Sequence, residues 1–337
     1  MTLANQLKDA EDAPAISTEP SQQNFRFISG LKPIFVGPNH LRAGWRLLIF
    51  LASFGILLGG FALLRTGGPQ GLREQYAKQS HVTMTPLVMG GSEAITLLFL
   101  CVAALFMSKL EHRKFSDYGL PLRGAMGKVF WFGSAVGFLT ISGTLLVMFL
   151  LHGFRINGLA LHGTAILSSL IAWGSAFLLV GLVEEFLFRG YIQYTLASGI
   201  GFWPAACLMS GLFGLGHAFN PNENAVGSVA VVMFGLLLCL FLRRTGNLWC
   251  AVGFHLGYDW GQMLYGVPDS GIVPYHSLLS STLSGPHWLS GGAVGPEASV
   301  LTPIALLIAG LVFSRYYREV QYQTETALDA CDILVTS

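Results

Sequence analysis

Long apolar runs alternate with short polar breaks along most of the 337-residue chain, and this pattern constrains the fold more than any other feature. A helix needs about 20 mainly apolar residues to cross the hydrocarbon core of a bilayer. Only 11% of the residues are charged, against about a quarter in an average soluble domain. One globular core cannot hide this much apolar surface, so lipid must solvate the rest. We therefore expect a polytopic membrane protein.

Eight of the apolar runs have the length and composition of membrane-spanning segments. Backbone polar groups in lipid must be paired within the protein, which favours helices for runs of this kind. The predicted fold class is all-α, a membrane helical bundle of about eight transmembrane helices. The fourth run is too long for one perpendicular span, so it is expected to be tilted, broken near Gly181, or continued beyond the membrane. The predicted spans are 44–64, 92–110, 127–151, 164–196, 202–218, 226–242, 247–265 and 301–317.

Polar segments flank the predicted transmembrane domain, which covers residues 44–318. Residues 1–43 are predicted to form a disordered tail, and residues 319–337 a polar C-terminal tail. Cytoplasmic loops of membrane proteins carry an excess of Lys and Arg. With the N-terminus inside, fourteen of the 19 basic residues fall on the cytoplasmic side and four on the other, and Arg189 lies within a span. These counts predict a multi-pass protein of a bacterial inner membrane with both termini in the cytoplasm.

Composition disfavours several classes of function. A net charge of +1, without a basic or aromatic RNA-binding pattern, argues against a nucleic-acid partner. The five cysteines show no CxxC spacing and are interpreted as small core residues. No internal repeat is visible, which weakens the case for a transporter built from inverted repeats.

Ionisable side chains gather in three neighbouring runs of the second half of the chain. Such groups are costly inside a bilayer, and by default they mark functional sites. Glu93 lies at a membrane edge and is given no role. The residues well inside the predicted spans are Glu184, Glu185, Arg189, His217, His255 and Asp259.

Helical geometry assigns different surroundings to the two adjacent glutamates. Glu185 and Arg189 stand four residues apart with the acid first, the favourable order for an ion pair. Glu184 lies about 100° around the helix from Glu185. It can therefore point into the bundle as a carboxylate that the arginine does not neutralise, which makes it the natural general base.

Each of the two buried histidines has a partner one helical turn away. Phe213 precedes His217 by four residues, so its ring can support the imidazole. Asp259 follows His255 by four residues and can orient that ring or bind the same water. Simple alternation of the spans places His217 nearer the end of its helix than the other groups, so tilt or a broad cavity must bring them together. The nearby glycines predicted to be helix contacts are Gly211, Gly214 and Gly216.

Carboxylates and imidazoles without a matched Ser or Cys nucleophile favour water activation and proton transfer, and hydrolysis is the simplest such reaction. A carboxylate takes a proton from water, one histidine assists, and the other histidine with Asp259 steadies the oxyanion. A zinc variant stays open, because two histidines and a carboxylate form a familiar zinc set. Its ligands would be Glu184, His217 and His255, whereas the favoured mechanism requires no cofactor.

Taken together, the three segments resemble the CPBP intramembrane proteases, a family that includes the type II CAAX prenyl proteases and bacteriocin-processing or immunity-type relatives. The resemblance covers about residues 164–265, and the order of the motifs makes it more specific than any one of them. It implies an eight-helix endopeptidase with its site inside the membrane. The matching segments are Glu184-Glu185-x-x-x-Arg189, Phe213-x-x-x-His217 and His255-x-x-x-Asp259.

The resemblance also implies a role for each matching residue. Glu184 activates water with help from His217, while His255 and Asp259 stabilise the oxyanion. Family members carry Asn or Asp at position 259, and the Asp in this chain adds a negative charge that tilts the balance toward a metal. Cleavage of prenylated CAAX proteins in particular does not follow from the resemblance. The residues that support the site are Glu185, Arg189 and Phe213.

The predicted function is hydrolysis of a peptide bond in a membrane-associated protein or peptide, by an enzyme surrounded by lipid. One alternative is a proton-coupled or metal-ion transporter whose acids and histidines form a relay. Another is a non-catalytic membrane scaffold or immunity protein. The substitution Glu184→Ala separates the three, since it abolishes cleavage in a protease, ion flux in a transporter, and neither binding nor assembly in a scaffold.

Overall fold

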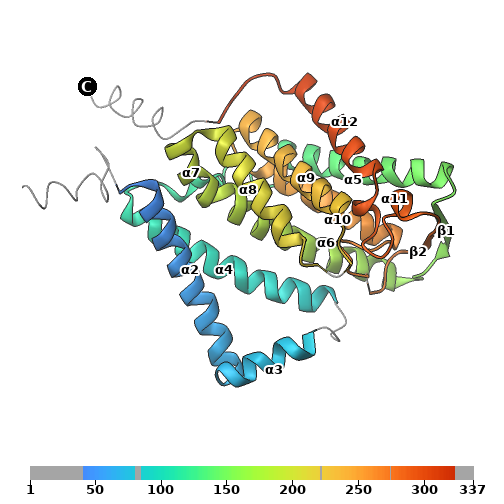
Figure 1. Cartoon of the computed structure of the whole chain (residues 1–337), viewed down its shortest axis with the longest axis horizontal. Helices are drawn as coiled ribbons and strands as arrows, with labels where there is room; N and C mark the ends of the chain where they lie inside the picture. Colours follow the sequence, from blue (N-terminus) through green and yellow to red (C-terminus); the bar gives the residue numbers. More distant parts are fainter. Residues whose placement is uncertain (1–40, 80–84, 221, 274, 323–337) are drawn as a thin grey trace, which may run out of the picture.

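The computed structural model describes residues 41–79, 85–220, 222–273 and 275–322, with side chains of the first segment described to residue 74. These residues form a helical bundle with a small two-stranded sheet at one end (Figure 1). Each of the eight predicted spans coincides with a helix or a helical run, which confirms the predicted class of helical membrane bundle. Most of both predicted polar tails lies outside the described residues.

The helices follow one another with short connections. The α-helices are α2 (Ala43–Thr66), α3 (Pro69–Gln79), α4 (Pro86–Leu110), α5 (Lys128–Leu150), α6 (Thr164–Glu185), α7 (Ile192–Ile200), α8 (Phe202–His217), α9 (Ala225–Thr245), α10 (Trp249–Tyr265), α11 (His287–Ser290) and α12 (Leu301–Tyr316). Two 3-10 turns, η1 (Phe115–Tyr118) and η3 (Pro296–Ala298), and a π-helical turn, η2 (Phe186–Tyr191), complete the helical elements, and the strands are β1 (Phe154–Leu159) and β2 (Leu279–Leu283).

Five helical runs in the described part are long and apolar enough to cross a membrane by length and composition. They are α2, α4, α5, α9 and the continuous run Thr164–Ile200. The helices α8, α10 and α12 coincide with the other predicted spans but have only 16, 17 and 16 residues. The protein is thus an integral multi-pass membrane protein, and the count of eight spans stays a prediction.

Helices α10 and α5 pack so closely that their backbones are in contact. A Cβ atom added at Gly257 would lie 2.0 Å from the carbonyl oxygen of Ser134, and one added at Gly253 would lie 2.1 Å from that of Phe130. On α5, Gly133 and Gly137 meet the backbone of α10 in the same way. Spacing of small residues by four lets two helices approach this closely in a membrane. Glycine is therefore required on both faces, and the contact fixes the position of α10 in the bundle.

The long fourth run is interrupted, but not at Gly181. Its α-helical geometry gives way to a π-helical turn after Glu185, and Gly190 has the non-helical angles φ −80° and ψ −118° before α7 begins. Gly181 serves another purpose, because a Cβ atom there would lie 3.4 Å from the Cβ atom of His255 on α10. This glycine lets the two helices that carry the central acids and histidine approach each other. Short π-helical turns of this kind often occur at functional sites.

The prediction of three glycine contacts on α8 is correct at one position only. A Cβ atom at Gly214 would lie 2.5 Å from a methyl group of Val232 on α9, whereas Gly211 and Gly216 have no neighbouring atom within 4 Å of the added carbon. Glycine spacing alone therefore does not reveal which side of a helix faces a partner.

The Gly- and Ser-rich segment 266–300 is folded rather than a plain loop. Its strand β2 pairs antiparallel with β1, with Phe154 opposite Leu283 and Leu159 opposite Leu279. The indole nitrogen of Trp173 on α6 donates to the backbone oxygen of Tyr275 at 3.0 Å. These contacts hold the segment over the end of the bundle near α10, as Figure 1 shows.

Candidate active site

A cavity of about 360 Å³ lies among α4, α6, α8, α9, α10 and the start of α12. Glu184 reaches it from α6, His217 from α8, and both His255 and Asp259 from α10. The structure therefore brings the four predicted catalytic residues to the wall of one cavity.

His255 is the centre of the polar network. Its Nδ1 lies 2.8 Å from Oε1 of Glu185, and its Nε2 lies 3.2 Å from Oδ2 of Asp259 and 3.5 Å from Oε2 of Glu184. Phe234 of α9 contacts the ring edge to face, with the ring centroids 5.1 Å apart. Both ring nitrogens face carboxylate oxygens, and both can donate only when the imidazole is protonated. The arrangement therefore favours an imidazolium ion held between carboxylates.

Glu185 is buried behind this histidine. Its Oε1 accepts from Nη1 of Arg189 at 3.2 Å as well as from His255, and the side chains of Glu185 and Arg189 are both 0% exposed. The guanidinium carbon lies 4.3 Å from the ring centroid of Phe213, a cation–π contact. The predicted ion pair is thus confirmed, and Glu185 has a second partner, His255, that spacing along one helix did not indicate.

Glu184 differs from its neighbour in access to the cavity. Its side chain is 28% exposed, and its contact with Nε2 of His255 is the long one at 3.5 Å. The carboxylate therefore remains open to water or substrate in the cavity.

His217 lines the cavity without touching the glutamates. Its Nδ1 lies 2.9 Å from the backbone oxygen of Phe213, and the two rings are 4.5 Å apart between centroids. A carbonyl oxygen only accepts, so Nδ1 carries the proton and Nε2 is an acceptor in the neutral ring. This tautomer leaves Nε2 available to take a proton from a molecule in the cavity.

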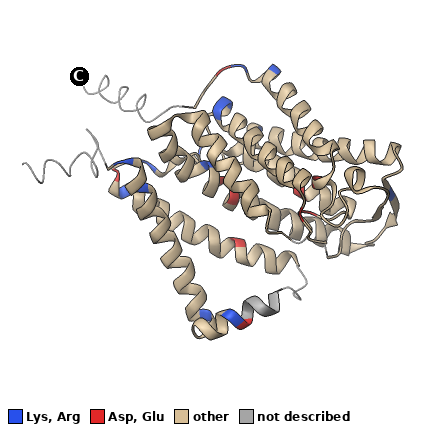
Figure 2. Cartoon of the chain, viewed as in Figure 1, with Lys and Arg blue, Asp and Glu red and all other residues tan. Residues whose placement is uncertain are grey.

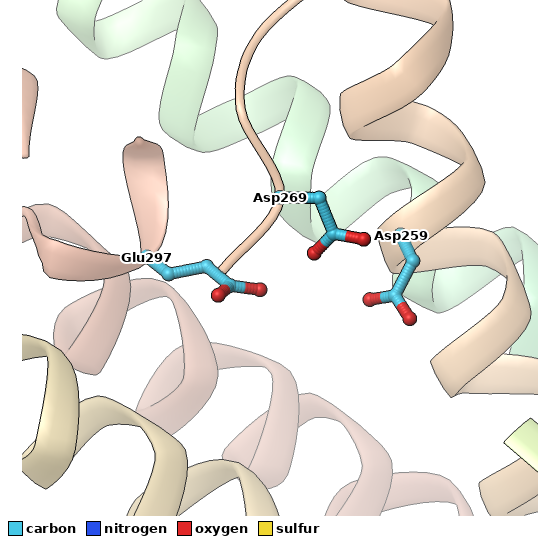
Figure 3. Close-up of side chains that lie close together, drawn as sticks. All are labelled: Asp259, Asp269 and Glu297. Carbon is cyan, nitrogen blue, oxygen red and sulfur yellow. The ribbon is translucent and has the colours of Figure 1, made fainter. Parts of the chain in front are cut away.

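The zinc ligands suggested from the sequence are not assembled. Among the described residues, the group of three or more acids, histidines or cysteines with ligand atoms within 4.8 Å of one another is Asp259, Asp269 and Glu297 (Figure 3). His217 is outside this distance from any such group. We therefore derive no step through a zinc ion held by Glu184, His217 and His255.

Sequence reasoning missed three acids at the cavity wall. Glu93 of α4, given no role above, faces the cavity, and so do Asp269 and Glu297 of the segment that connects α10 to α12. Burial, and then the charges of Asp259 and Glu297, raise the pKa of Asp269 well above its usual value. The one available signal was indirect: residues 266–300 contain acids but no Lys or Arg to pair with them.

Fold and site together define a multi-pass helical membrane protein with carboxylates and imidazoles around an internal cavity. Residues 166–261 match the Rce1-like family, described as type II CAAX prenyl endopeptidase Rce1-like. The match confirms the predicted family resemblance and includes every predicted site residue. It indicates a protease, of the CAAX-type intramembrane kind in general, with a peptide substrate reached in the membrane environment. No curated protein and no solved structure was found to match the chain.

Proposed function

We propose that the protein is an intramembrane endopeptidase that hydrolyses a peptide bond of a membrane-associated protein or peptide, with Glu184 as the base that activates water. The contrast between two adjacent glutamates carries this proposal. Glu185 is fully buried and holds Arg189 and His255, whereas Glu184 is partly exposed to the cavity. The first is a positioning residue, and the second is free to exchange protons.

In the proposed reaction, Glu184 takes a proton from a water molecule while the water oxygen attacks the carbonyl carbon of the substrate. The carbonyl electron pair moves onto its oxygen, which becomes the oxyanion of a tetrahedral intermediate. Nε2 of His255 donates its one proton to this oxyanion, and the new bond takes the place of the contacts with Asp259 at 3.2 Å and Glu184 at 3.5 Å. Collapse of the intermediate breaks the C–N bond, and the departing amine takes the proton from Glu184.

His217 and Asp259 have assisting roles in this proposal. Nε2 of His217 is an acceptor that faces the same cavity, so it can help to hold the attacking water. Before the oxyanion forms, Asp259 accepts from Nε2 of His255 and so sets the direction of the imidazole. We propose that no cofactor is required.

The distribution of charge supports an orientation with both termini in the cytoplasm of a bacterium. Figure 2 shows Lys and Arg positions, blue on the ribbon, where α2 begins and where α9 and α12 end. Because cytoplasmic segments carry an excess of Lys and Arg, we propose that this end lies at the cytoplasmic face of the inner membrane.

A cleavage assay in lipid nanodiscs tests the proposal. The purified chain is incubated with a library of membrane-anchored peptides, and cleavage is followed by mass spectrometry. Glu184→Gln should lower the rate by about 10²–10⁴, the usual contribution of a general base. The matched control is Asp117→Asn, a carboxyl group that accepts from the backbone of Lys114 and does not line the cavity.

The outcome also separates the competing functions. Glu184→Gln that elutes as a folded protein and cleaves like the parent would refute the role of this residue. Ion flux in proteoliposomes, lost in Glu184→Gln and without peptide cleavage, would instead identify a transporter. Peptide binding without cleavage or flux, unchanged in the variant, would identify a scaffold.

A further inference from the structure

We propose that Asp259, Asp269 and Glu297 bind one hard divalent cation of the calcium type at the cavity wall. The three residues come from α10, the chain that follows it, and η3, and their carboxylate oxygens lie within 4.8 Å of one another. Figure 3 shows the three carboxyl groups turned toward a common space. This acid cluster is distinct from the zinc set considered for the proposed reaction.

Neither Asp269 nor Glu297 forms an ion pair with a basic side chain in the part of the chain that the structure describes, and the positive charge that acts on Asp269 is that of His255. Nε2 of Gln262 donates to Asp269 at 3.0 Å and to Glu297 at 2.9 Å. The backbone nitrogen and hydroxyl group of Ser270 donate to the other oxygen of Glu297. Asp259 shares its one basic neighbour, His255, with Glu184 and Glu185. Neutral donors orient the acid cluster but do not balance its charge.

One fully buried polar atom beside the cluster has no hydrogen-bond partner among the described residues. It is Oε1 of Gln262, whose side chain is 0% exposed and whose amide nitrogen touches two of the acids. Buried polar atoms are rarely left unsatisfied, and a cation with its water shell at this point would satisfy it. Tyr258 lines the same cavity beside Thr302, and the charges of Glu297, Asp259 and Asp269 act on its hydroxyl group.

The chemistry of the ligands selects the kind of ion. All the candidate ligand atoms are oxygens, which suit calcium, magnesium and manganese rather than zinc. Calcium takes six to eight oxygens at about 2.3–2.6 Å, so two ligands of one ion can be up to about 5 Å apart. Magnesium requires shorter and more regular distances. Carboxylates that come from α10, the chain after it and the short turn η3 suit the variable distances and coordination number of calcium better than the regular octahedron of magnesium.

Ion binding to the full-length protein in detergent, after treatment with a chelator, tests this inference without any cleavage assay. Calcium is added and heat of binding is measured by calorimetry. We expect one calcium ion per chain, and at least tenfold weaker binding in Asp269→Asn and in Glu297→Gln. The matched control is Glu93→Gln, which removes a carboxyl group from the α4 wall of the same cavity and should bind within about threefold of the parent.

Binding by Asp269→Asn as tight as that of the parent overturns the proposal, and so does the absence of binding up to about 10 mM calcium, beyond the range of weak calcium modules. Equal losses in Glu93→Gln would show a general effect of cavity charge and also overturn it. Should one acid variant fail to fold, Tyr258→Phe, which deletes only the hydroxyl group on which the charges of the three acids act, must weaken binding at least threefold. Tighter binding of magnesium or zinc than of calcium contradicts the calcium assignment.

Discussion

Replacing Glu185 with alanine removes the oxygen that both Arg189 and His255 use, and it leaves a fully buried guanidinium without its carboxylate. Removing one partner of a buried ion pair costs about 3–5 kcal/mol in the free energy of unfolding. Glu184→Ala removes a partly exposed side chain with one 3.5 Å contact, and exposed pairs contribute about 0–1 kcal/mol. The two neighbouring substitutions should therefore differ by about 2–5 kcal/mol in stability.

Activity should follow a different order. Glu184→Ala is expected to abolish cleavage in a stable protein, whereas Glu185→Ala lowers stability and disturbs the orientation of His255. The double variant Glu185→Ala/Arg189→Met removes both charges and should recover part of the lost stability, since paired residues in one network are not additive. SDS titration in mixed micelles measures the unfolding free energies. Equal stability of Glu184→Ala and Glu185→Ala would refute the assignment of different roles, and so would a double variant that is less stable than Glu185→Ala.

Three other substitutions or treatments have defined outcomes. Gly257→Ala should cost about 1–3 kcal/mol through overpacking against Ser134, whereas Gly216→Ala, with open space around it, should be neutral or slightly stabilising in the same titration. Cleavage by the metal-free mechanism should continue in phenanthroline, a zinc chelator, and a complete loss that added zinc reverses would contradict it. In a cysteine-free background, a maleimide that does not cross membranes should label Arg155→Cys in intact cells and Arg123→Cys only after lysis; the reverse pattern would invert the proposed orientation.

Contacts within one helix were predictable from the sequence, and contacts between helices were not. The pairs Glu185–Arg189, Phe213–His217 and His255–Asp259 follow from the four-residue repeat of an α-helix, and all three are in contact. The bond between His255 and Glu185 joins two helices. It depends on how closely α6 and α10 approach each other, and no local pattern reports that distance.

The acids of the segment 266–300 were missed for a related reason. Asp269 and Glu297 lie in irregular chain without hydrophobic periodicity, so no period of 3.6 or 2 residues indicates which side chains turn inward. Tertiary hydrogen bonds to Gln262 and Ser270 determine their direction. Because this segment contains no Lys or Arg, the acids that meet at the cavity have no basic residue close to them in the sequence.

Small residues set the geometry of the site as much as the charged ones do. Gly253 and Gly257 allow the backbones of α10 and α5 to touch and so fix the position of α10 relative to α5. Gly181 lets α6 approach within van der Waals distance of His255. A shift of one helix by about 1 Å would lengthen the 2.8 Å bond between His255 and Glu185 beyond hydrogen-bond range. A glycine that touches no substrate can therefore control the direction of the imidazole. For this reason Gly257→Ala should lower the cleavage rate by more than its cost in stability explains, even under conditions where the variant is fully folded.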